Sequence, residues 1–342
     1  MSTTDFTREE QQAIQEKGFV MRMACLPAAA VGICALAWRW PIDAPLVRLT
    51  WTCFTAYFLF CWTSCFHETA HQTLTRWRWL DITIGRLLGT LMYVPYTVYR
   101  ESHIRHHAYL NRPNDWELWP YSNPTYSRTF RRVFVVLDIC FGFIAAPFIY
   151  GRIFFHPDSP LKNAGLRRTI KYEYWGIILF WGYVFCKSTY TGGWLWYAHV
   201  WLVPHWIAGM FQTIRKLTEH LGMASYDPML GTRTVVGRNW ITRLGSFMNF
   251  DIFIHGPHHR HPKLAQNRLK GKMEEYLADN PETKYPVYPS YLQATIAMMP
   301  YLVTNPGIGM NVGAAPPEEA KVRDINNFPA DVTREVHQSA GH

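Results

Sequence analysis

The sequence predicts an all-helical integral-membrane protein, with four transmembrane helices in two hairpins and a cytosolic helical region that caps them and carries clusters of histidines. Two observations lead to this class. Long apolar stretches with few charges recur along the 342 residues, and about 20 such residues in a helix can cross the ~30 Å hydrocarbon core of a bilayer. Polar blocks that contain most of the 15 histidines alternate with these stretches.

The four predicted spans are recognised by their low charge and by the Trp and Tyr residues near their ends, where such side chains meet lipid headgroups. The spans are residues 18–38, 45–66, 173–190 and 193–213. Short connections join the first to the second and the third to the fourth, which makes two hairpins. The competing interpretation is a soluble protein with very hydrophobic core helices, and four separate runs of this length favour the membrane.

Two shorter apolar stretches, residues 82–96 and 133–150, separate the histidine clusters. If either crossed the bilayer alone, some clusters would lie on the opposite face from the others, and no single metal centre could form. We therefore expect both to be re-entrant or interfacial. One domain then covers residues 1–312, and the tail 313–342, which is largely polar and charged, is expected to be disordered.

The formal net charge of +9 comes mainly from Lys and Arg in the loops. This distribution indicates contact with anionic membrane lipids. By the positive-inside rule it places the N-terminus and the histidine clusters on the cytoplasmic side of a bacterial inner membrane or the endoplasmic reticulum. It does not indicate nucleic-acid binding, because the basic residues are spread among apolar segments rather than gathered in a stripe.

Three histidine clusters stand outside the long apolar runs. They are HETAH with His67 and His71, HIRHH with His103, His106 and His107, and HGPHH with His255, His258 and His259. On a helix the spacings of the first two clusters put every imidazole on one face, so each cluster can offer its nitrogens to one point. In the third cluster Gly256 and Pro257 predict that the helix begins only at the proline, with His255 just outside it.

The number and type of these side chains point to two metal ions. Imidazole suits Fe, Zn, Cu and Ni, and eight histidines exceed the about four to six ligands of one ion. No cysteine has a ligand-type spacing near the clusters, which argues against an iron–sulfur or structural zinc site. Two redox-active irons could use dioxygen to attack an unactivated C–H bond. A metal transporter would instead place its histidines inside the spans, and single histidines are commonly ordinary surface or core residues.

The order of the clusters resembles the membrane fatty-acid desaturase superfamily, whose members carry three histidine boxes. HIRHH begins 36 residues after HETAH, and HGPHH follows far downstream. The flank PYTVYRESHIRHHAYLNRPNDWE also resembles the family's second box. The matching positions are Pro95, Tyr96, Arg100, Ser102, Tyr109, Asn111 and Asp115. The resemblance covers about residues 20–270. It implies a four-helix membrane bundle, two non-haem irons, dioxygen as co-substrate, and a fatty-acyl chain in a narrow tunnel past the metals.

The resemblance also makes His220 a predicted ninth ligand, because many members carry an additional ligand directly after the fourth span. The alternative is an ordinary polar residue at a helix end. His261 is expected at the surface, and His156, His337 and His342 are not expected to be ligands. His199 and His205 lie within the predicted fourth span, where polar groups are costly; a hydrogen bond to a neighbouring helix is the simpler explanation for them.

Carboxylate and amide side chains near the clusters are predicted to orient the imidazoles through their free N–H groups. The candidates are Glu68, Asp115, Glu117, Glu219, Asn249 and Asp251. A solvated charge or a helix cap explains each of them equally well. Asn249 could also reach the metal site directly or through a water molecule.

The predicted function is dioxygen-dependent desaturation of a fatty-acyl chain carried by a lipid, coenzyme A or acyl carrier protein. A hydroxylase or carotenoid ketolase on the same scaffold is the alternative, followed by a non-catalytic metal-binding protein. The sequence lacks a CxxC pair, a dinucleotide-binding glycine loop and an HPGG haem signature. A separate ferredoxin, rubredoxin or cytochrome is therefore expected to supply electrons. Its predicted docking site is a set of basic residues, for which contact with lipid is the alternative role: Arg260, Lys263, Arg268, Lys270 and Lys272.

Overall fold

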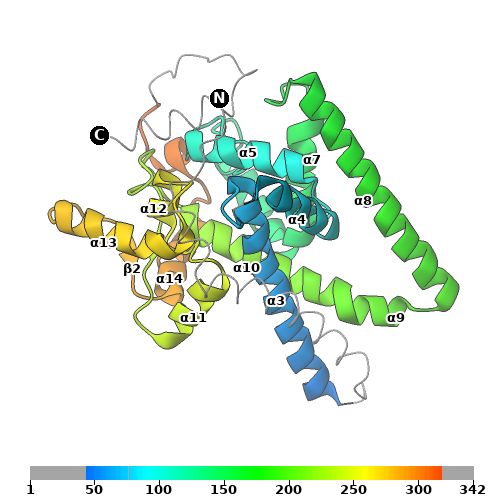
Figure 1. Cartoon of the computed structure of the whole chain (residues 1–342). Helices are drawn as coiled ribbons and strands as arrows, with labels where there is room; N and C mark the ends of the chain where they lie inside the picture. Colours follow the sequence, from blue (N-terminus) through cyan, green and yellow to red (C-terminus); the bar gives the residue numbers. More distant parts are fainter. Residues whose placement is uncertain (1–43, 76, 318–342) are drawn as a thin grey trace.

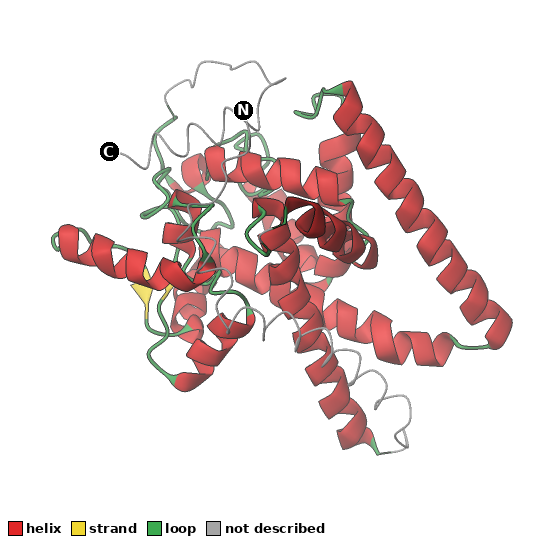
Figure 2. Ribbon diagram, viewed as in Figure 1, coloured by secondary structure: helices red, strands yellow, loops and turns green. Residues whose placement is uncertain are grey.

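The computed structural model describes residues 44–75 and 77–317, and most of them are helical (Figure 2). The predicted span 18–38 and residues 318–342 of the predicted tail lie outside the described residues.

The long helices make up most of the fold (Figure 1). In chain order they are α3 (Pro45–His71), α4 (Arg78–Leu91), α5 (Tyr96–Ala108), α6 (Arg128–Cys140), α7 (Gly142–Phe155), α8 (Ala164–Thr191), α10 (Val203–His220), α11 (Trp240–Met248), α13 (Leu269–Asp279) and α14 (Tyr291–Thr304). The shorter elements are α9 (Trp194–Tyr197), the π-helical turn Ala198–Leu202, α12 (His255–Arg260), the 3₁₀ turns Gln266–Arg268 and Gly309–Val312, and the strands β1 (Thr234–Val235) and β2 (Val287–Tyr288).

The prediction of four transmembrane helices is wrong. Within residues 44–75 and 77–317, none of the helices combines the length and the apolar character needed to cross a bilayer. The predicted span 45–66 lies in α3, where Trp, Tyr, Thr and Ser occupy many of the uncharged positions. These side chains carry polar atoms, so a stretch with few charges is not necessarily strongly apolar.

The other two predicted spans in the described part of the chain fail for different reasons. The span 173–190 lies in α8, a helix of 28 residues that begins at Ala164 and carries several Arg, Lys and Glu residues. The span 193–213 is divided among α9, the π-helical turn and α10, and α10 continues past it to the charged and polar sequence that ends at His220. Of the two shorter apolar stretches, 82–96 covers most of α4, and 133–150 is split between α6 and α7 at Phe141.

Several helices begin where the sequence provides a capping side chain. In four helices the side chain of the capping residue accepts a hydrogen bond from a backbone N–H of the first turn. The capping residues are Ser127 for α6, Asn163 for α8, Asn239 for α11 and Ser290 for α14. Such caps satisfy donors that have no partner inside the helix and contribute about 1 kcal/mol each. At the other end of α3, Gln72 adopts a left-handed conformation with φ of 58° and ends the helix directly after His71.

The centre of the molecule is the pair α3 and α10. Thr63 donates to Gln212 at 2.6 Å, and Arg215 donates to Ser64 at 2.7 Å. Helices α4 and α5 both pack against α3. Helix α4 also approaches the start of α5 so closely that a Cβ at Gly85 would lie 2.4 Å from the Tyr96 ring. This packing brings the C-terminal half of α3, with its two histidines, against α5.

Helix α8 runs along the outside of this core (Figure 1). Its Glu173 ties it to the neighbouring helices by accepting from the backbone N–H and hydroxyl of Thr97 at 2.8 and 2.7 Å, and from Arg86 at 3.0 Å. Trp181 adds a hydrogen bond of 2.7 Å to the carbonyl of Thr90. The helix is therefore attached to α4 and α5 by polar contacts.

The strands β1 and β2 form a short parallel pair that positions the third histidine cluster. Thr234 pairs with Val287 and Val235 with Tyr288. The hydroxyl of Thr234 accepts from the backbone N–H of Gly256 at 2.9 Å, inside α12. This contact holds the short helix α12 against the strand and fixes the direction of its imidazoles.

Candidate metal centre

All nine histidines that the sequence proposes as ligands are buried and fall into two adjacent groups. In the first group all potential ligand atoms lie within 4.8 Å of one another, whereas the second combines two overlapping sets of that kind, which share His220. The first set, called here the five-histidine group, contains His67, His71, His103, His107 and His258. The second, called the four-histidine group, contains His106, His220, His255 and His259.

Two of the sequence clusters divide their histidines between these groups. At 3.6 residues per turn, residues four apart on a helix point about 40° from each other, whereas a residue three positions on points about 60° to the other side. His103 and His107 therefore share one group, and His106 turns to the other. The expectation that each cluster serves a single point is wrong for HIRHH.

The same rule divides the third cluster. His255 and His259 point to the four-histidine group and His258 to the five-histidine group. This requires a helix over the whole cluster, and α12 begins at His255 rather than at Pro257 as expected. A proline in the first turn is compatible with that start, because its missing N–H would have no partner inside the helix.

Within each group the Nε2 atoms come close together. Nε2 of His103 lies 3.0 Å from that of His71 and 3.1 Å from that of His107. Nε2 of His255 lies 2.9 Å from that of His220 and 3.0 Å from that of His259. Two nitrogens about 2.1 Å from one ion stand about 3.0 Å apart at a right angle and about 3.4 Å apart at a tetrahedral angle. The spacing thus fits a metal with more than four ligands.

Four of the rings are oriented from their far side. Nδ1 of His67 lies 3.1 Å from Glu68, Nδ1 of His103 lies 3.1 Å from Glu117, and Nδ1 of His106 lies 2.8 Å from Asp115. These partners can only accept, so each Nδ1 carries the proton and each Nε2 presents a lone pair. The fourth ring, His255, is held in the same way by the carbonyl of Ile252 at 3.2 Å.

The buried donor atoms fit a cation. Nε2 of His67 and Nε2 of His258 both belong to the five-histidine group, and neither has a hydrogen-bond partner among the described residues. Burial, and then repulsion between neighbouring imidazoles, hold the pKa of His67, His71 and His107 well below the usual value. Neutral imidazoles are the form that binds metals.

Glu219 lies beside the Nε2 atom of a histidine, which is the position of a metal ligand, and not beside an Nδ1 atom, which an imidazole-orienting group would contact. Its Oε2 is 3.5 Å from Nε2 of His255, on the metal-facing side of that ring, and it forms one candidate group with His220 and His255. Burial raises the pKa of Glu219 to about 8, although Arg215 and His106 oppose the shift. A cation at this site would favour the carboxylate form.

The two remaining polar candidates bond elsewhere. Asn249 accepts from the hydroxyl of Ser64 at 2.7 Å, and Asp251 accepts from Ser246 at 2.9 Å. His261 lies 3.0 Å from the hydroxyl of Tyr276, outside both groups. His156 lies in the loop after α7, beside Asp158, and His337 and His342 fall outside the described residues.

Two tyrosines near the metal groups were missed by the sequence reasoning. Tyr150 donates to Glu117 at 3.0 Å, and Glu117 in turn holds His103. The ring of Tyr99 stacks on that of His103, with centroids 5.5 Å apart and planes 9° from parallel. Tyr99 could have been found, because it precedes His103 by one helical turn. Tyr150 comes from a different helix, so only the fold brings it to the site.

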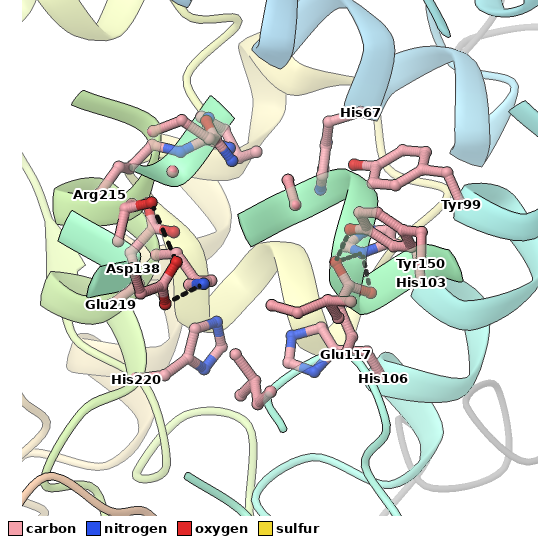
Figure 3. Close-up of a pocket in the computed structure, with 18 of the residues that line it drawn as sticks. His67, Tyr99, His103, His106, Glu117, Asp138, Tyr150, Arg215, Glu219 and His220 are labelled. Carbon is pink, nitrogen blue, oxygen red and sulfur yellow. Dashed lines mark hydrogen bonds and ion pairs between the residues drawn. The ribbon is translucent and has the colours of Figure 1, made fainter. Parts of the chain in front are cut away.

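Two cavities meet at these tyrosines. One, of about 90 Å³, is bounded by His67, His103 and His106 on one side and by Asp138, Glu219 and His220 on the other (Figure 3). Asp138 binds Lys216 at 2.7 Å there. The other cavity, of about 100 Å³, has a mainly apolar lining. Both are lined by Tyr99, Gly142, Ala146, Tyr150 and Gln212, so the apolar cavity adjoins the metal groups.

Comparison with known proteins gives matches to proteins that modify fatty acids. A Delta(12) acyl-lipid conjugase (11E,13E-forming) from Impatiens balsamina is 23 % identical over 241 residues, which cover 61 % of this chain and 62 % of that protein. An acyl-lipid (9+3)-(E)-desaturase from Dimorphotheca sinuata is 26 % identical over 171 residues, 45 % of each chain. A Delta(9) fatty acid conjugase-like enzyme from the same plant is 42 % identical over 45 residues, 13 % of this chain and 12 % of that protein.

These matches span less than two thirds of each relative's length. The family model described as fatty acid desaturase, in contrast, matches residues 43–291, which is most of the chain and includes every histidine of the two groups. The predicted resemblance is thereby confirmed, and the chain belongs to the fatty acid desaturase family.

Proposed function

We propose that this protein desaturates a fatty-acyl chain, using dioxygen and electrons from a separate carrier, at a centre of two non-haem irons. The observation that supports this most directly is the pair of adjacent, buried groups of imidazole nitrogens, each with the spacing of ligands around one ion. One iron would be held by the five-histidine group. The other would be held by the four-histidine group, with Glu219 as an additional oxygen ligand.

Iron bound in this way supplies redox chemistry with dioxygen, which no side chain of the protein could supply alone. The overall reaction removes two hydrogens from adjacent chain carbons. With two electrons from the carrier and two protons from solution, it reduces one dioxygen to two waters and leaves a carbon–carbon double bond.

The protein's own residues would orient the imidazoles, keep the metal groups away from bulk water and position the acyl chain. The carboxylates of Glu68, Asp115 and Glu117 hold the Nδ1 atoms, so that each Nε2 points inward without rearrangement. The histidines are buried, with exposed fractions of 5 % or less, which keeps bulk water from the reacting carbons. The apolar cavity would hold the chain beside Tyr99 and Tyr150, next to the five-histidine group.

We further propose an acyl chain esterified to a lipid as substrate, because two of the matched relatives are named for acyl-lipid chemistry. The electron carrier is proposed to dock near the metal groups. Of the basic residues expected to attract it, Lys263 donates to the carbonyl of His71 at 2.9 Å, whereas Lys270 and Lys272 pair with Glu274 and Glu275. These pairs reduce the positive charge of that surface.

The deciding experiment is expression in a desaturase-deficient host, followed by mass spectrometry of total acyl chains and iron analysis of the purified protein. Desaturation appears as new chains that lack two hydrogens, and hydroxylation as chains that gain one oxygen. New double bonds that disappear in the His106→Ala variant support the proposal. Purified protein that binds iron but leaves every acyl chain unchanged, with an electron donor supplied, would contradict it.

A further inference from the structure

One face of α10 lines both cavities. The residues on this face follow one another at spacings of four and three, which places them on a single side of the helix. They are His205, Gly209, Gln212, Lys216 and Glu219. At 1.5 Å per residue, His205 lies about 21 Å along the helix axis from Glu219. A chain that follows this face from the apolar cavity to the metal groups therefore passes each of these positions.

The apolar cavity contains polar groups without partners. His205 is nine-tenths buried and forms no hydrogen bond with any described residue; its ring stacks on Trp201 and meets the rings of Phe143 and Tyr93 edge-on. The Nε1 donor of Trp62, on the same cavity, is buried and has no partner within the described part of the chain. Buried polar groups in native proteins are normally paired, so such groups call for a ligand or a water molecule.

The state of His205 sets what it can bind. Burial lowers the pKa of His205 to about 4, so its imidazole is neutral under ordinary conditions. A neutral imidazole offers one N–H donor and one acceptor nitrogen. The indole of Trp62 offers a donor only. An oxygen atom that accepts hydrogen bonds matches both side chains, whereas a plain methylene chain would leave both unpaired.

We propose that the apolar cavity takes an acyl chain that carries an oxygen atom part-way along its length, as a hydroxyl, oxo or epoxide group, and that His205 and Trp62 hydrogen-bond this oxygen. The inference rests on the proposed function, since it assumes that an acyl chain enters along α10. It narrows the substrate from fatty-acyl chains in general to oxygenated ones. A site with buried hydrogen-bonding groups discriminates against analogues that lack the matching atom.

The test measures binding to the metal-free protein, so that it does not depend on catalysis. Isothermal titration calorimetry would compare octadecanoate with a positional series of monohydroxyoctadecanoates. We expect at least one positional isomer to bind about tenfold more tightly than octadecanoate, the ratio that one or two well-made hydrogen bonds supply. Isomers with the hydroxyl several carbons away should show no such gain.

Two variants identify the groups responsible. His205→Phe and Trp62→Phe keep an aromatic ring and remove the hydrogen-bonding atoms, so each should reduce the preference for the favoured isomer to about threefold or less. Binding of octadecanoate should be retained in both. The matched control is His199→Phe, the same substitution in the neighbouring π-helical turn, where the side chain does not line the cavity. It should keep the full preference.

The outcomes separate this inference from the proposed function. Equal affinities for octadecanoate and every hydroxylated isomer would overturn the inference alone and indicate that water satisfies these groups. A preference that survives both substitutions would also overturn it. Failure of the folded protein to bind any of the chains, offered free or esterified in a phospholipid, would count against the proposed function as well, because acyl binding would then be lost altogether.

Discussion

The Nε2 atoms of His220 and His255 lie 2.9 Å apart, although the two residues are 35 positions apart in the chain. His220 ends α10 and His255 begins α12, so neither local helix geometry nor a shared cluster explains the contact. A shared metal ion would account for two buried neutral imidazoles at this distance. We therefore predict that His220 holds the second metal ion.

The His220→Ala variant should lose about one of about two irons per chain, because the five-histidine group does not include this residue. Iron analysis of the purified, folded variant measures this directly. His261→Ala is the matched control, since His261 contacts Tyr276 outside both groups and should leave the iron content unchanged. Full iron occupancy in His220→Ala would show that this residue is not a ligand.

Asp115 is predicted to control the metal affinity of the four-histidine group through His106. The Asp115→Asn substitution keeps the shape of the side chain but removes the charge that accepts from Nδ1 of His106 at 2.8 Å. Loss of such a partner typically weakens metal binding by about 10- to 100-fold. Chelator competition should show this loss for one of the two irons only. Glu117→Gln should weaken the binding of the other iron, which we propose His103 to hold; equal effects of both substitutions on both irons would contradict the assignment.

Ala146 is predicted to keep open the connection between the apolar cavity and the metal groups. It lies between Gly142 and Tyr150 on one face of α7, and all three residues line both cavities. A leucine at this position fills the junction, so Ala146→Leu should lower kcat/KM for the acyl substrate about tenfold or more. The iron content should not change. Ala145→Leu adds the same volume at the neighbouring residue, which lines neither cavity, and should have little effect on kcat/KM. Similar losses in the two variants would argue against the proposed route.

The sequence predicts which histidines gather in the fold better than it predicts the architecture. The spacing of His103 and His107 is a local helical property, so a shared metal could be expected from the sequence. The turn of His106 and His258 away from their cluster neighbours is also local, but the group that each of them joins depends on how α5 and α12 face each other, which tertiary packing determines. From the sequence, Glu219 is predicted to orient an imidazole because it stands next to His220. In the fold it belongs to one candidate group with His220 and His255, and that placement depends on how α10 packs against α12.

The failure of the span prediction has a different origin. Residues 45–66 carry few charges, which predicts a span, but the Thr, Ser and Tyr side chains of this stretch keep hydrogen-bonding atoms. Several of them, such as Ser64 and Thr63, form contacts with α10. The C-terminal half of α3 is buried in protein, whereas its first turns expose Leu46 and Leu49, so a low number of charges does not by itself predict where a helix lies.

Asp81 is predicted to make the protein less stable as the pH rises. Its side chain is buried, it accepts from the backbone and hydroxyl of Thr75, and its Oδ2 has no partner within the described residues. Burial raises the pKa of Asp81 to about 7 from its ordinary 3.8. The folded protein therefore binds a proton that the unfolded chain releases between pH 3.8 and about 7, and the free energy of unfolding falls across that interval.

Asp81→Asn keeps the acceptor for Thr75 and cannot ionise. Urea titrations of both proteins should show the variant gaining stability relative to the natural chain by at most about 3 kcal/mol between pH 5 and pH 8. Asp158→Asn, at a side chain that is 86 % exposed, should show no comparable gain. A stability difference between Asp81→Asn and the natural chain that stays constant over this range would mean that Asp81 ionises without cost in the folded state.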